Sequence, residues 1–523
     1  MKQSSQKRVK EHYQALRQLS PAALWSNEVP AFNAAKPAER LQNVSVIRAV
    51  GVVFSEAGTP HQKTEALVWL RALVQDPEEK IRRYAMAALP KLGSGEAEEK
   101  QLLTLANQAV SVKETQFLAK TLERIGGSET LNAALSALPH PLAINPQRLQ
   151  ANIARRQGED GISMEALLPV FEGLRIALDC RKGVEHFLFD ELESSDSLKS
   201  IFKIHAVRSG WVELRPKRSF SLNQLYALRC FSAVVFLLPD LPPLPRPGAP
   251  LDETALAGVI SSNLSTHILG HLSQGAARYR LEFDSRGADP ALIQRISETA
   301  FKRCPLLLND SREAPWEIRI HESPNGVYTE LHPKLRPDPR FAYRRGDVPA
   351  ASHPPLAAAL ARVAGIGTFH TERIWDPFCG SGLELAECLL ISKESAVFGT
   401  DLSAKAIEVA QANVQAVTGK SSASAAGQFR QCDFREGPAK LGLRDLTLLI
   451  TNPPLGKRVP VADLEIMVEG VFKLANELLQ KGGRLVFVNP LKTRPRHGRL
   501  RLRLSHKVDL GFAHFQLEKY VAE

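Results

Sequence analysis

Two short stretches of the chain carry residue types that could do chemistry. Residues 375–382 read WDPFCGSG, and residues 451–458 read TNPPLGKR. In the first stretch, glycines remove side-chain bulk, so the main chain can pass close to a ligand where the next helix starts. In the second, two prolines stiffen a loop in which the Asn452 side-chain oxygen and the Pro453 carbonyl can accept hydrogen bonds. Such a pair of acceptors could hold the two N–H groups of an exocyclic amine and turn its lone pair toward an electrophilic methyl group.

These stretches belong to a segment in which strands and helices alternate. From residue 373 on, the strands are apolar enough to be buried on both faces, which predicts a doubly wound parallel sheet. Ligands of such sheets bind at the carboxyl ends of the strands, and the sequence places Asp376, Asp401, Asp433 and Asn452 at four such ends. Asp401 stands where an acidic group accepts both hydroxyls of a ribose. The loop is not GxGxxG, which disfavours a dinucleotide.

The order DPFCGSG, GTDLS, CDF and NPP resembles the motifs of class I S-adenosylmethionine-dependent methyltransferases. The resemblance implies a Rossmann-like α/β domain over residues 350–523, S-adenosyl-L-methionine as cofactor and no metal. It implies that the position of Asp433 contacts the adenine, with Phe434 packing beside it. The residues implied in cofactor binding are Asp376, Phe378, Cys379, Gly380, Ser381, Gly382, Asp401, Leu402, Asp433 and Phe434. Those implied in catalysis are Asn452, Pro453, Pro454 and Leu455.

Leu455 departs from the family pattern. The family usually has tyrosine or phenylalanine after NPP, whose ring stacks on a flipped-out base, a contact of about 1–3 kcal/mol. Leu383 also replaces the usual threonine after GSG, whereas Glu387 in the following helix matches the pattern. Either other walls of the site hold the base, or the domain has lost turnover and keeps only RNA or cofactor binding. Because the three carboxylates and Asn452 are present together, we favour an active enzyme.

The first part of the chain has the periodicity of stacked helices. Residues 64–137 show helical apolar spacing interrupted by short polar turns, with a cap followed by proline at Asp76-Pro77 and a break at Gly126-Gly127. The pattern resembles HEAT-type repeats, and we expect an α-helical repeat region over residues 1–140 that offers a surface to a protein partner.

The middle of the chain, residues 165–345, changes to an α+β pattern. It contains two α+β pieces separated by the proline-rich residues 239–250, which we interpret as a spacer that cannot pair in a sheet. Two predicted strands meet at the turn Pro324-Asn325-Gly326. The order of these elements, ending in FAYRR before the DPFCGSG stretch, resembles the ferredoxin-like and THUMP-containing RNA-binding half of guanine-N2 methyltransferases of transfer or ribosomal RNA.

A basic segment lies near the end of the chain. Its arginines include Arg494, Arg496, Arg499, Arg501 and Arg503. The alternation in GRLRLRLS would place the last three on one face of a strand, where they could contact a phosphate backbone. The alternative is a solvated edge strand whose charge discourages pairing with other chains.

Composition narrows the class of protein. The chain has 523 residues and a net charge of +11, which suits roughly three or four domains and a polyanionic partner such as RNA. The six cysteines have no CxxC spacing, which argues against a zinc site, an iron-sulfur cluster or a disulfide framework and suits the cytoplasm. No apolar run is long enough for a membrane span.

The sequence as a whole predicts a multidomain RNA methyltransferase that acts on an exocyclic base amine. The resemblance implies guanine N2 of tRNA or rRNA as that amine. Two alternatives stay open. One is a catalytically weakened or inactive methyltransferase-like factor that binds RNA or assists assembly. The other is a protein glutamine-amide N-methyltransferase, since those enzymes share NPP-type loops.

Overall fold

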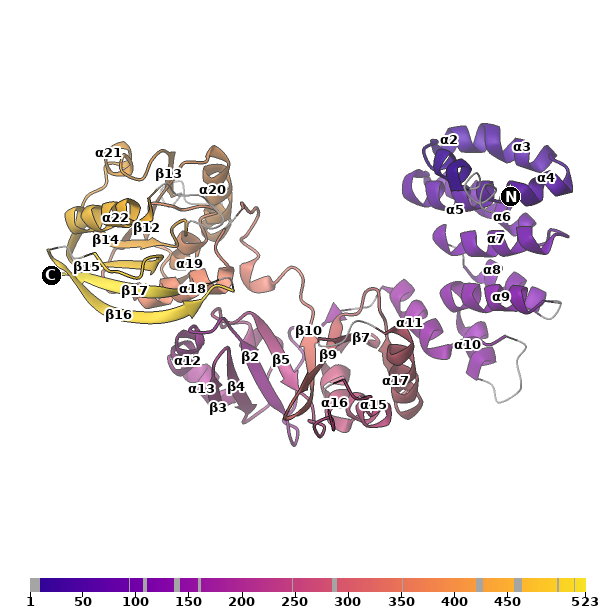
Figure 1. The fold of residues 1–523 in the computed structure, drawn as a ribbon, viewed down its shortest axis with the longest axis horizontal. Helices are drawn as coiled ribbons and strands as arrows, with labels where there is room; N and C mark the ends of the chain where they lie inside the picture. The colour runs from indigo at the N-terminus through magenta and orange to yellow at the C-terminus, as the bar shows by residue number, and fades with distance from the viewer. Residues whose placement is uncertain are drawn as a thin grey trace.

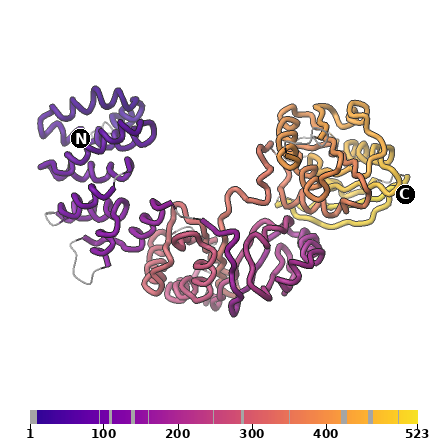
Figure 2. Tube along the Cα trace, turned by 180° about the vertical axis from the view of Figure 1, so that it is seen from behind, coloured from indigo at the N-terminus to yellow at the C-terminus, as the bar shows by residue number. Residues whose placement is uncertain are grey.

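The computed structural model describes residues 10–523 except 94, 107–110, 136–141, 159–160, 247, 285–288, 350, 420–426, 456–462, 496–497 and 512. Three regions follow one another along the longest axis: a helical region, a mixed middle region and a second α/β region (Figure 1). Seen from behind, the first and the last again lie at opposite ends with the middle region between them (Figure 2). No helix in the described residues is long and apolar enough to cross a bilayer.

The N-terminal region is helical, as the periodicity predicts. Its elements are α2 (Pro21–Ala23), η1 (Leu24–Glu28), α3 (Val29–Ala34), α4 (Pro37–Gln42), α5 (Ser45–Ala57), α6 (Pro60–Leu73), α7 (Glu79–Ala88), η2 (Leu89–Lys91), α8 (Glu96–Ala106), α9 (Val112–Ile125), α10 (Ser128–Leu135) and α11 (Pro146–Gln157). They share one apolar core, and Arg82 of α7 pairs with the buried Glu114 of α9 at 2.5 Å. Their assignment to HEAT-type repeats stays a prediction.

The expected cap at Asp76 is displaced. Helix α7 starts at Glu79 rather than directly after Asp76. Asp76 accepts a hydrogen bond from the Glu78 N–H at 2.9 Å, and its carboxylate forms an ion pair with Arg40 at 2.6 Å. Its carboxylate therefore shapes the turn that leads into the helix and links it to α4.

Helix α11 anchors the helical region to the middle one. Arg155 on this helix pairs with Asp310 at 2.5 Å, and the same carboxylate accepts from the buried Arg278 at 2.6 Å. Asn145, the N-cap of α11, donates to Glu298 at 3.0 Å. The base of the helical region is therefore held to the middle region by an ion pair to Asp310, just after β8, and by a hydrogen bond to α17.

The middle region is built on one continuous sheet. Its elements are β1 (Gly161–Ile162), β2 (Arg175–Asp179), α12 (Glu185–Glu193), α13 (Asp196–Ile201), β3 (Phe202–Arg208), β4 (Trp211–Pro216), α14 (Leu222–Leu225), β5 (Ala233–Leu237), α15 (Glu253–Ile260), α16 (Asn263–Leu272), β6 (Ser273–Gln274), β7 (Ala277–Phe283), α17 (Pro290–Arg303), β8 (Leu307–Asn309), β9 (Trp316–Ser323), β10 (Gly326–Pro333) and η3 (Pro339–Phe341). The strand order is β3-β4-β2-β5-β10-β9-β7-β8. The two α+β pieces of the sequence analysis are thus joined edge to edge through β5 and β10.

The proline-rich stretch takes part in this sheet at one residue. Leu241 pairs with Val327 through two backbone hydrogen bonds of 2.9 and 3.0 Å. The expectation that residues 239–250 cannot pair is wrong there, because Leu241 keeps its N–H, and the pairing stops at the prolines that follow it. The predicted turn before Gly326 is confirmed, since β9 and β10 form an antiparallel hairpin.

The C-terminal region is the predicted doubly wound sheet. Its elements are α18 (Pro354–Ala364), β11 (Arg373–Asp376), α19 (Leu383–Ile391), β12 (Ala396–Asp401), α20 (Ala404–Thr418), β13 (Gln428–Gln431), α21 (Gly437–Leu441), β14 (Leu446–Thr451), α22 (Leu464–Leu478), β15 (Leu479–Asn489), β16 (Leu500–Asp509) and β17 (His514–Ala522). The strand order is β13-β12-β11-β14-β15-β17-β16, with β17 antiparallel to both of its neighbours. The chain reverses direction across the sheet between β11 and β14, the place where such folds form a ligand crevice.

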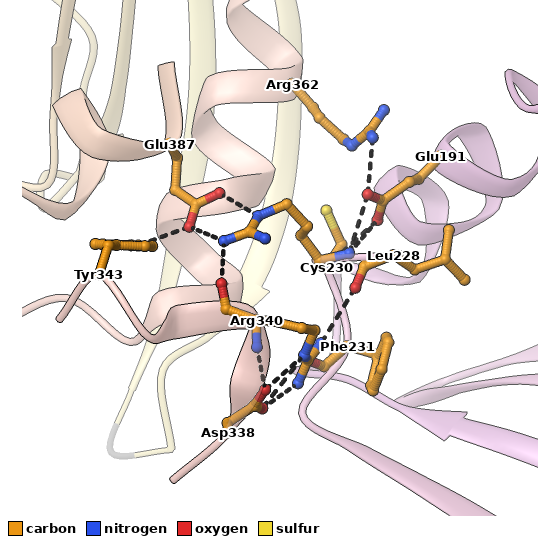
Figure 3. A network of polar contacts seen from close by, with 10 residues as sticks. Glu191, Leu228, Cys230, Phe231, Asp338, Arg340, Tyr343, Arg362 and Glu387 are labelled. Atoms are coloured by element: carbon orange, nitrogen blue, oxygen red, sulfur yellow. Dashed lines mark hydrogen bonds and ion pairs between the residues drawn. The ribbon is translucent and has the colours of Figure 1, made fainter. Parts of the chain in front are cut away.

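A buried polar network joins the middle region to helix α19. Arg229 donates to both carboxylate oxygens of Glu387, at 2.7 and 2.8 Å, and to the Arg340 carbonyl at 2.8 Å. The Tyr343 hydroxyl donates to the same Glu387 carboxylate at 2.6 Å (Figure 3). Arg229 keeps its charge because this bidentate pair offsets the cost of burial.

A second contact lies at the end of β16. The Asp509 N–H donates to the Lys182 carbonyl at 2.8 Å, and a Cβ on Gly183 would overlap the Lys507 carbonyl oxygen. Gly183 has a φ of +93°, so both its backbone conformation and its close approach require glycine. This packing places the neighbouring Arg181 at the edge of the C-terminal region's cleft.

We predict that Arg229→Met lowers the free energy of unfolding of the C-terminal region by about 3–5 kcal/mol, because it leaves Glu387 buried without its cation. Urea titration followed by hydrogen exchange at the α19 amides measures the change. Arg295→Met is the matched control, since Arg295 pairs with Glu253 at the surface, and this variant should unfold like the wild type. Equal midpoints for both variants would contradict a role of the Arg229 pair in stability.

Candidate active site

A cleft of about 550 Å³ opens at the carboxyl ends of β11, β12 and β14. One wall is formed by the ends of these strands, and the other by the connector that precedes α18 together with Arg181 and Leu510. The cleft contains eight of the predicted site residues: Phe378, Gly380, Asp401, Leu402, Asn452, Pro453, Pro454 and Leu455. The sheet therefore brings the two stretches of the sequence analysis to one place.

The glycine loop is held in shape by hydrogen bonds that its backbone N–H groups and that of Ser403 donate. The Gly380 N–H donates to Asp401 Oδ2 at 3.0 Å, and the Ser403 N–H donates to Asp401 Oδ1 at 2.9 Å. The Gly382 N–H donates to the Cys379 carbonyl at 2.6 Å. Asp401 thus ties the loop to the start of α20 while it also lines the cleft.

The two glycines of this loop are needed for different reasons. Both have positive φ, +50° at Gly380 and +75° at Gly382. A Cβ on Gly382 would lie 3.0 Å from the Ala410 Cβ, whereas a Cβ on Gly380 would have nothing within 4 Å. Gly382 is therefore required by packing of the protein itself, and Gly380 leaves open space beside the cleft.

Asp376 lies beneath the loop and not on the cleft. It is fully buried, and its Oδ1 accepts from the Phe378 N–H at 3.0 Å. Burial raises the pKa of Asp376 well above its usual value, and the neighbouring Glu384 adds to the increase. Its position supports the loop from below. Cys379, Ser381 and Gly382 are buried within the loop itself and do not line the cleft.

Asp433 and Phe434 also lie away from the cleft. Asp433 forms a two-point ion pair with Arg435, at 2.6 and 2.8 Å, and this pair lowers the pKa of Asp433. Phe434 is buried with its ring 4.8 Å from that of Phe378, which does line the cleft. Two of the four polar groups expected to converge, Asp401 and Asn452, do so, and the other two are engaged elsewhere.

Asn452 is oriented by a hydrogen bond on one side only. Its Nδ2 donates to Ser352 Oγ at 2.9 Å, and Ser352 donates to the Glu384 carboxylate. Within the described part of the chain, the buried Asn452 Oδ1 has no hydrogen-bond partner. An unpaired buried acceptor costs about 1–3 kcal/mol, so a donor from a bound molecule would be stabilised there.

Sequence reasoning missed three polar groups of the cleft: Arg181, Ser352 and His353. Burial lowers the pKa of His353 to about 4, and the nearby Arg181 and Arg344 guanidiniums add to the effect, so the imidazole is neutral near pH 7. None of the three belongs to a motif, and Arg181 comes from the middle region. Arg344 and Ser403, which also line the cleft, belong to the FAYRR and GTDLS stretches.

The basic segment does not form a regular row of guanidiniums. Arg499 precedes β16 and donates to the Asn476 and Leu479 carbonyls at 2.6 and 2.7 Å. A register shift between Leu502 and Leu504 breaks the alternation, and Leu502 is 39% exposed rather than inward.

The other arginines of this segment contact carboxylates of the protein. Arg494 pairs with the buried Glu518 at 2.5 Å, and Arg501 and Arg503 pair with Glu523 at 3.3 and 2.7 Å. Arg496 lies outside the described residues. These contacts agree with the edge-strand alternative, and an RNA contact by these arginines stays a prediction.

Comparison with known proteins identifies the C-terminal region. Residues 342–516 match the family described as "UPF0020: RMKL-like, methyltransferase domain". This region is a methyltransferase domain. S-adenosylmethionine is the methyl donor that such a domain implies, and the open space beside Gly380 together with the exposed edge of Asp401 suits a ligand that bears a ribose.

Solved structures are similar to a longer part of the chain. TrmN from Thermus thermophilus is 20% identical, with 67% of this chain and 100% of that chain covered and a TM-score of 0.49. A "possible methylase" from Clostridium difficile 630 is 15% identical, with 67% and 98% covered and a TM-score of 0.47. A "predicted N6-adenine-specific DNA methylase" from Listeria monocytogenes str. 4b F2365 is 15% identical, with 67% and 96% covered and a TM-score of 0.45. No curated protein matches the sequence.

The two glycines give a testable contrast. Gly380→Ala should weaken S-adenosylmethionine binding at least about tenfold, because the added methyl group occupies ligand space, at a folding cost of only about 1–2 kcal/mol for the left-handed backbone. Gly382→Ala should lower the unfolding midpoint more strongly, because its Cβ also presses on Ala410. Calorimetry with the cofactor and thermal unfolding measure the two effects. Unchanged cofactor affinity in Gly380→Ala would show that the space beside Gly380 is not ligand space.

Proposed function

We propose that this protein is an S-adenosylmethionine-dependent RNA methyltransferase that acts on an exocyclic base amine, guanine N2 of transfer or ribosomal RNA. The observation that carries the proposal is the Asn452 amide. Its NH2 group is committed to Ser352, and its buried oxygen is left without a partner in the described part of the chain. The residue therefore offers an acceptor and not a donor.

An acceptor at this position selects the kind of atom that is methylated. An exocyclic amine presents N–H groups and is a hydrogen-bond donor, whereas an unprotonated ring nitrogen presents a lone pair and would face the Asn452 oxygen unfavourably. The Pro453 carbonyl is the second acceptor that we assign to the amine. With both N–H groups held, the nitrogen lone pair turns away from the ring plane and becomes nucleophilic.

S-adenosylmethionine, when bound, supplies the methyl group on its sulfonium. In our proposal Asp401 accepts the ribose hydroxyls, and the glycine loop passes beside the rest of the cofactor. The proton lost by the product needs no strong base, because a methylated ammonium is acidic enough to release it to water or to a nearby acceptor. The neutral His353 is available as such an acceptor, since its Nδ1 has no partner among the described residues.

RNA as the substrate is supported by charge and by position. The net charge of +11 favours a polyanion, and Arg181 and Arg344 stand at the cleft. The two acceptors at Asn452 and Pro453 do not by themselves separate guanine N2 from adenine N6, since both are exocyclic amines. We assign guanine because the middle region resembles the THUMP-containing half of guanine-N2 methyltransferases.

One observation favours the binding alternative. Leu455 lines the cleft where the resembling enzymes carry an aromatic ring, and it is half-buried against the core. A factor that binds RNA without transfer would need no such ring. The unpaired Asn452 oxygen favours the enzyme, because RNA binding alone does not require a buried acceptor without a partner.

We predict that Asn452→Ala lowers methyl transfer to RNA at least about 100-fold and leaves S-adenosylmethionine affinity unchanged, because the amine loses an acceptor that the transition state needs. Mass spectrometry of nucleosides from cells with and without the protein supplies the modified base, and calorimetry supplies the affinity. The label from a methyl-labelled cofactor should be released by ribonuclease and not by protease. Label that resists ribonuclease and is released by protease would instead indicate a protein glutamine amide.

A second prediction concerns Leu455. Leu455→Tyr should leave cofactor affinity as in the wild type and lower the KM for RNA, since a stacked base gains about 1–3 kcal/mol on an aromatic ring. Steady-state kinetics at fixed cofactor concentration measures the change. Equal losses in cofactor and RNA affinity would show that residue 455 does not face the base.

A further inference from the structure

We propose that Ser352 and Glu384 are positioning residues that fix the Asn452 amide with its oxygen, rather than its NH2 group, left for the substrate. This inference rests on the proposed function and adds two residues that no motif identifies. Ser352 lies in the connector before α18, and Glu384 lies in the first turn of α19. The three residues come from three separate segments and meet at the wall of the cleft, which Ser352 and Asn452 line.

The direction of the hydrogen bonds follows from the chemistry of each group. A serine hydroxyl has one proton, and Ser352 donates it to the Glu384 carboxyl oxygen. The hydroxyl lone pairs then face Asn452, where only the Nδ2 group can donate, at 2.9 Å. The amide oxygen is thereby excluded from this side.

An asparagine amide without this constraint has two orientations of nearly the same shape. In the reversed one, its NH2 group would face the N–H groups of the substrate amine, and two donors would oppose each other. Holding one orientation removes the nonproductive state before the substrate binds, which is preorganisation of a hydrogen-bond acceptor.

Burial of the Glu384 carboxylate lowers the free energy of unfolding. The carboxylate is 3% exposed and lies near the fully buried Asp376, and burial raises the pKa of both groups. Ser352 donates to Glu384, and the acids Asp376 and Glu387 lie close enough to it to interact with its charge. An apolar side chain at this site would give a more stable fold. We therefore infer that the carboxylate serves to orient Ser352.

The test uses the full chain and RNA from cells that lack the protein. Ser352→Ala and Glu384→Met should each lower the single-turnover transfer rate about 10- to 100-fold, with cofactor affinity within about twofold of the wild type. Ser352→Thr keeps the hydroxyl and should retain most of the rate. Glu384→Met should also raise the unfolding midpoint, because it removes a buried carboxylate beside Asp376, whereas loss of a merely structural residue would lower it.

A readout independent of turnover keeps the two proposals separable. In protein labelled with ¹⁵N-asparagine, the Asn452 side-chain NH2 signals, assigned from their loss in Asn452→Ala, should shift in Ser352→Ala and stay in place in Ser352→Thr. Unchanged signals or unchanged transfer rates in Ser352→Ala and Glu384→Met would overturn the positioning role. A wild-type chain that transfers no methyl group while these signals shift as expected would overturn the proposed function and leave the positioning role supported.

Discussion

The bidentate pair between Arg229 and Glu387 is the interaction on which the cleft depends. Glu387 is on the helix that begins at the glycine loop, and Glu384 precedes it by almost one turn. Because the pair and the Tyr343 hydroxyl bond fix α19 against the middle region, they also fix the first turn that carries Glu384. The site is therefore assembled from both regions, and Arg181 from the middle one completes its wall.

The C-terminal fold could be predicted because its determinants are local. Apolar strands alternating with helices specify a doubly wound sheet, and the carboxyl ends of its strands must share one edge. That rule correctly placed Asp401 and Asn452 together. It does not specify where a side chain at a strand end points: Asp376 turns under the loop, and Arg435 engages Asp433.

The remaining features depend on pairs that are far apart in the sequence. Ser352 and Asn452 are 100 residues apart, and Arg229 and Glu387 are 158 apart. No local pattern links such residues, because the contact exists only after both regions are packed. The bulge in β16 is similar: the alternation of leucine and arginine predicts a regular strand, and the register shift appears only when β16 pairs with β17.

Helix α11 fixes the position of the helical region relative to the middle region. The charged cluster around Asp310 holds this helix against the sheet, and the rest of the helical region extends from it to the end of the molecule opposite the cleft (Figure 1). A ligand bound both at the helical region and at the cleft must therefore be long enough to span the distance between them. For the RNA substrate that we propose, a short fragment with the target base would fill the cleft alone, and only a large folded RNA would reach both places at once. The architecture would then select substrates by size as well as by chemistry.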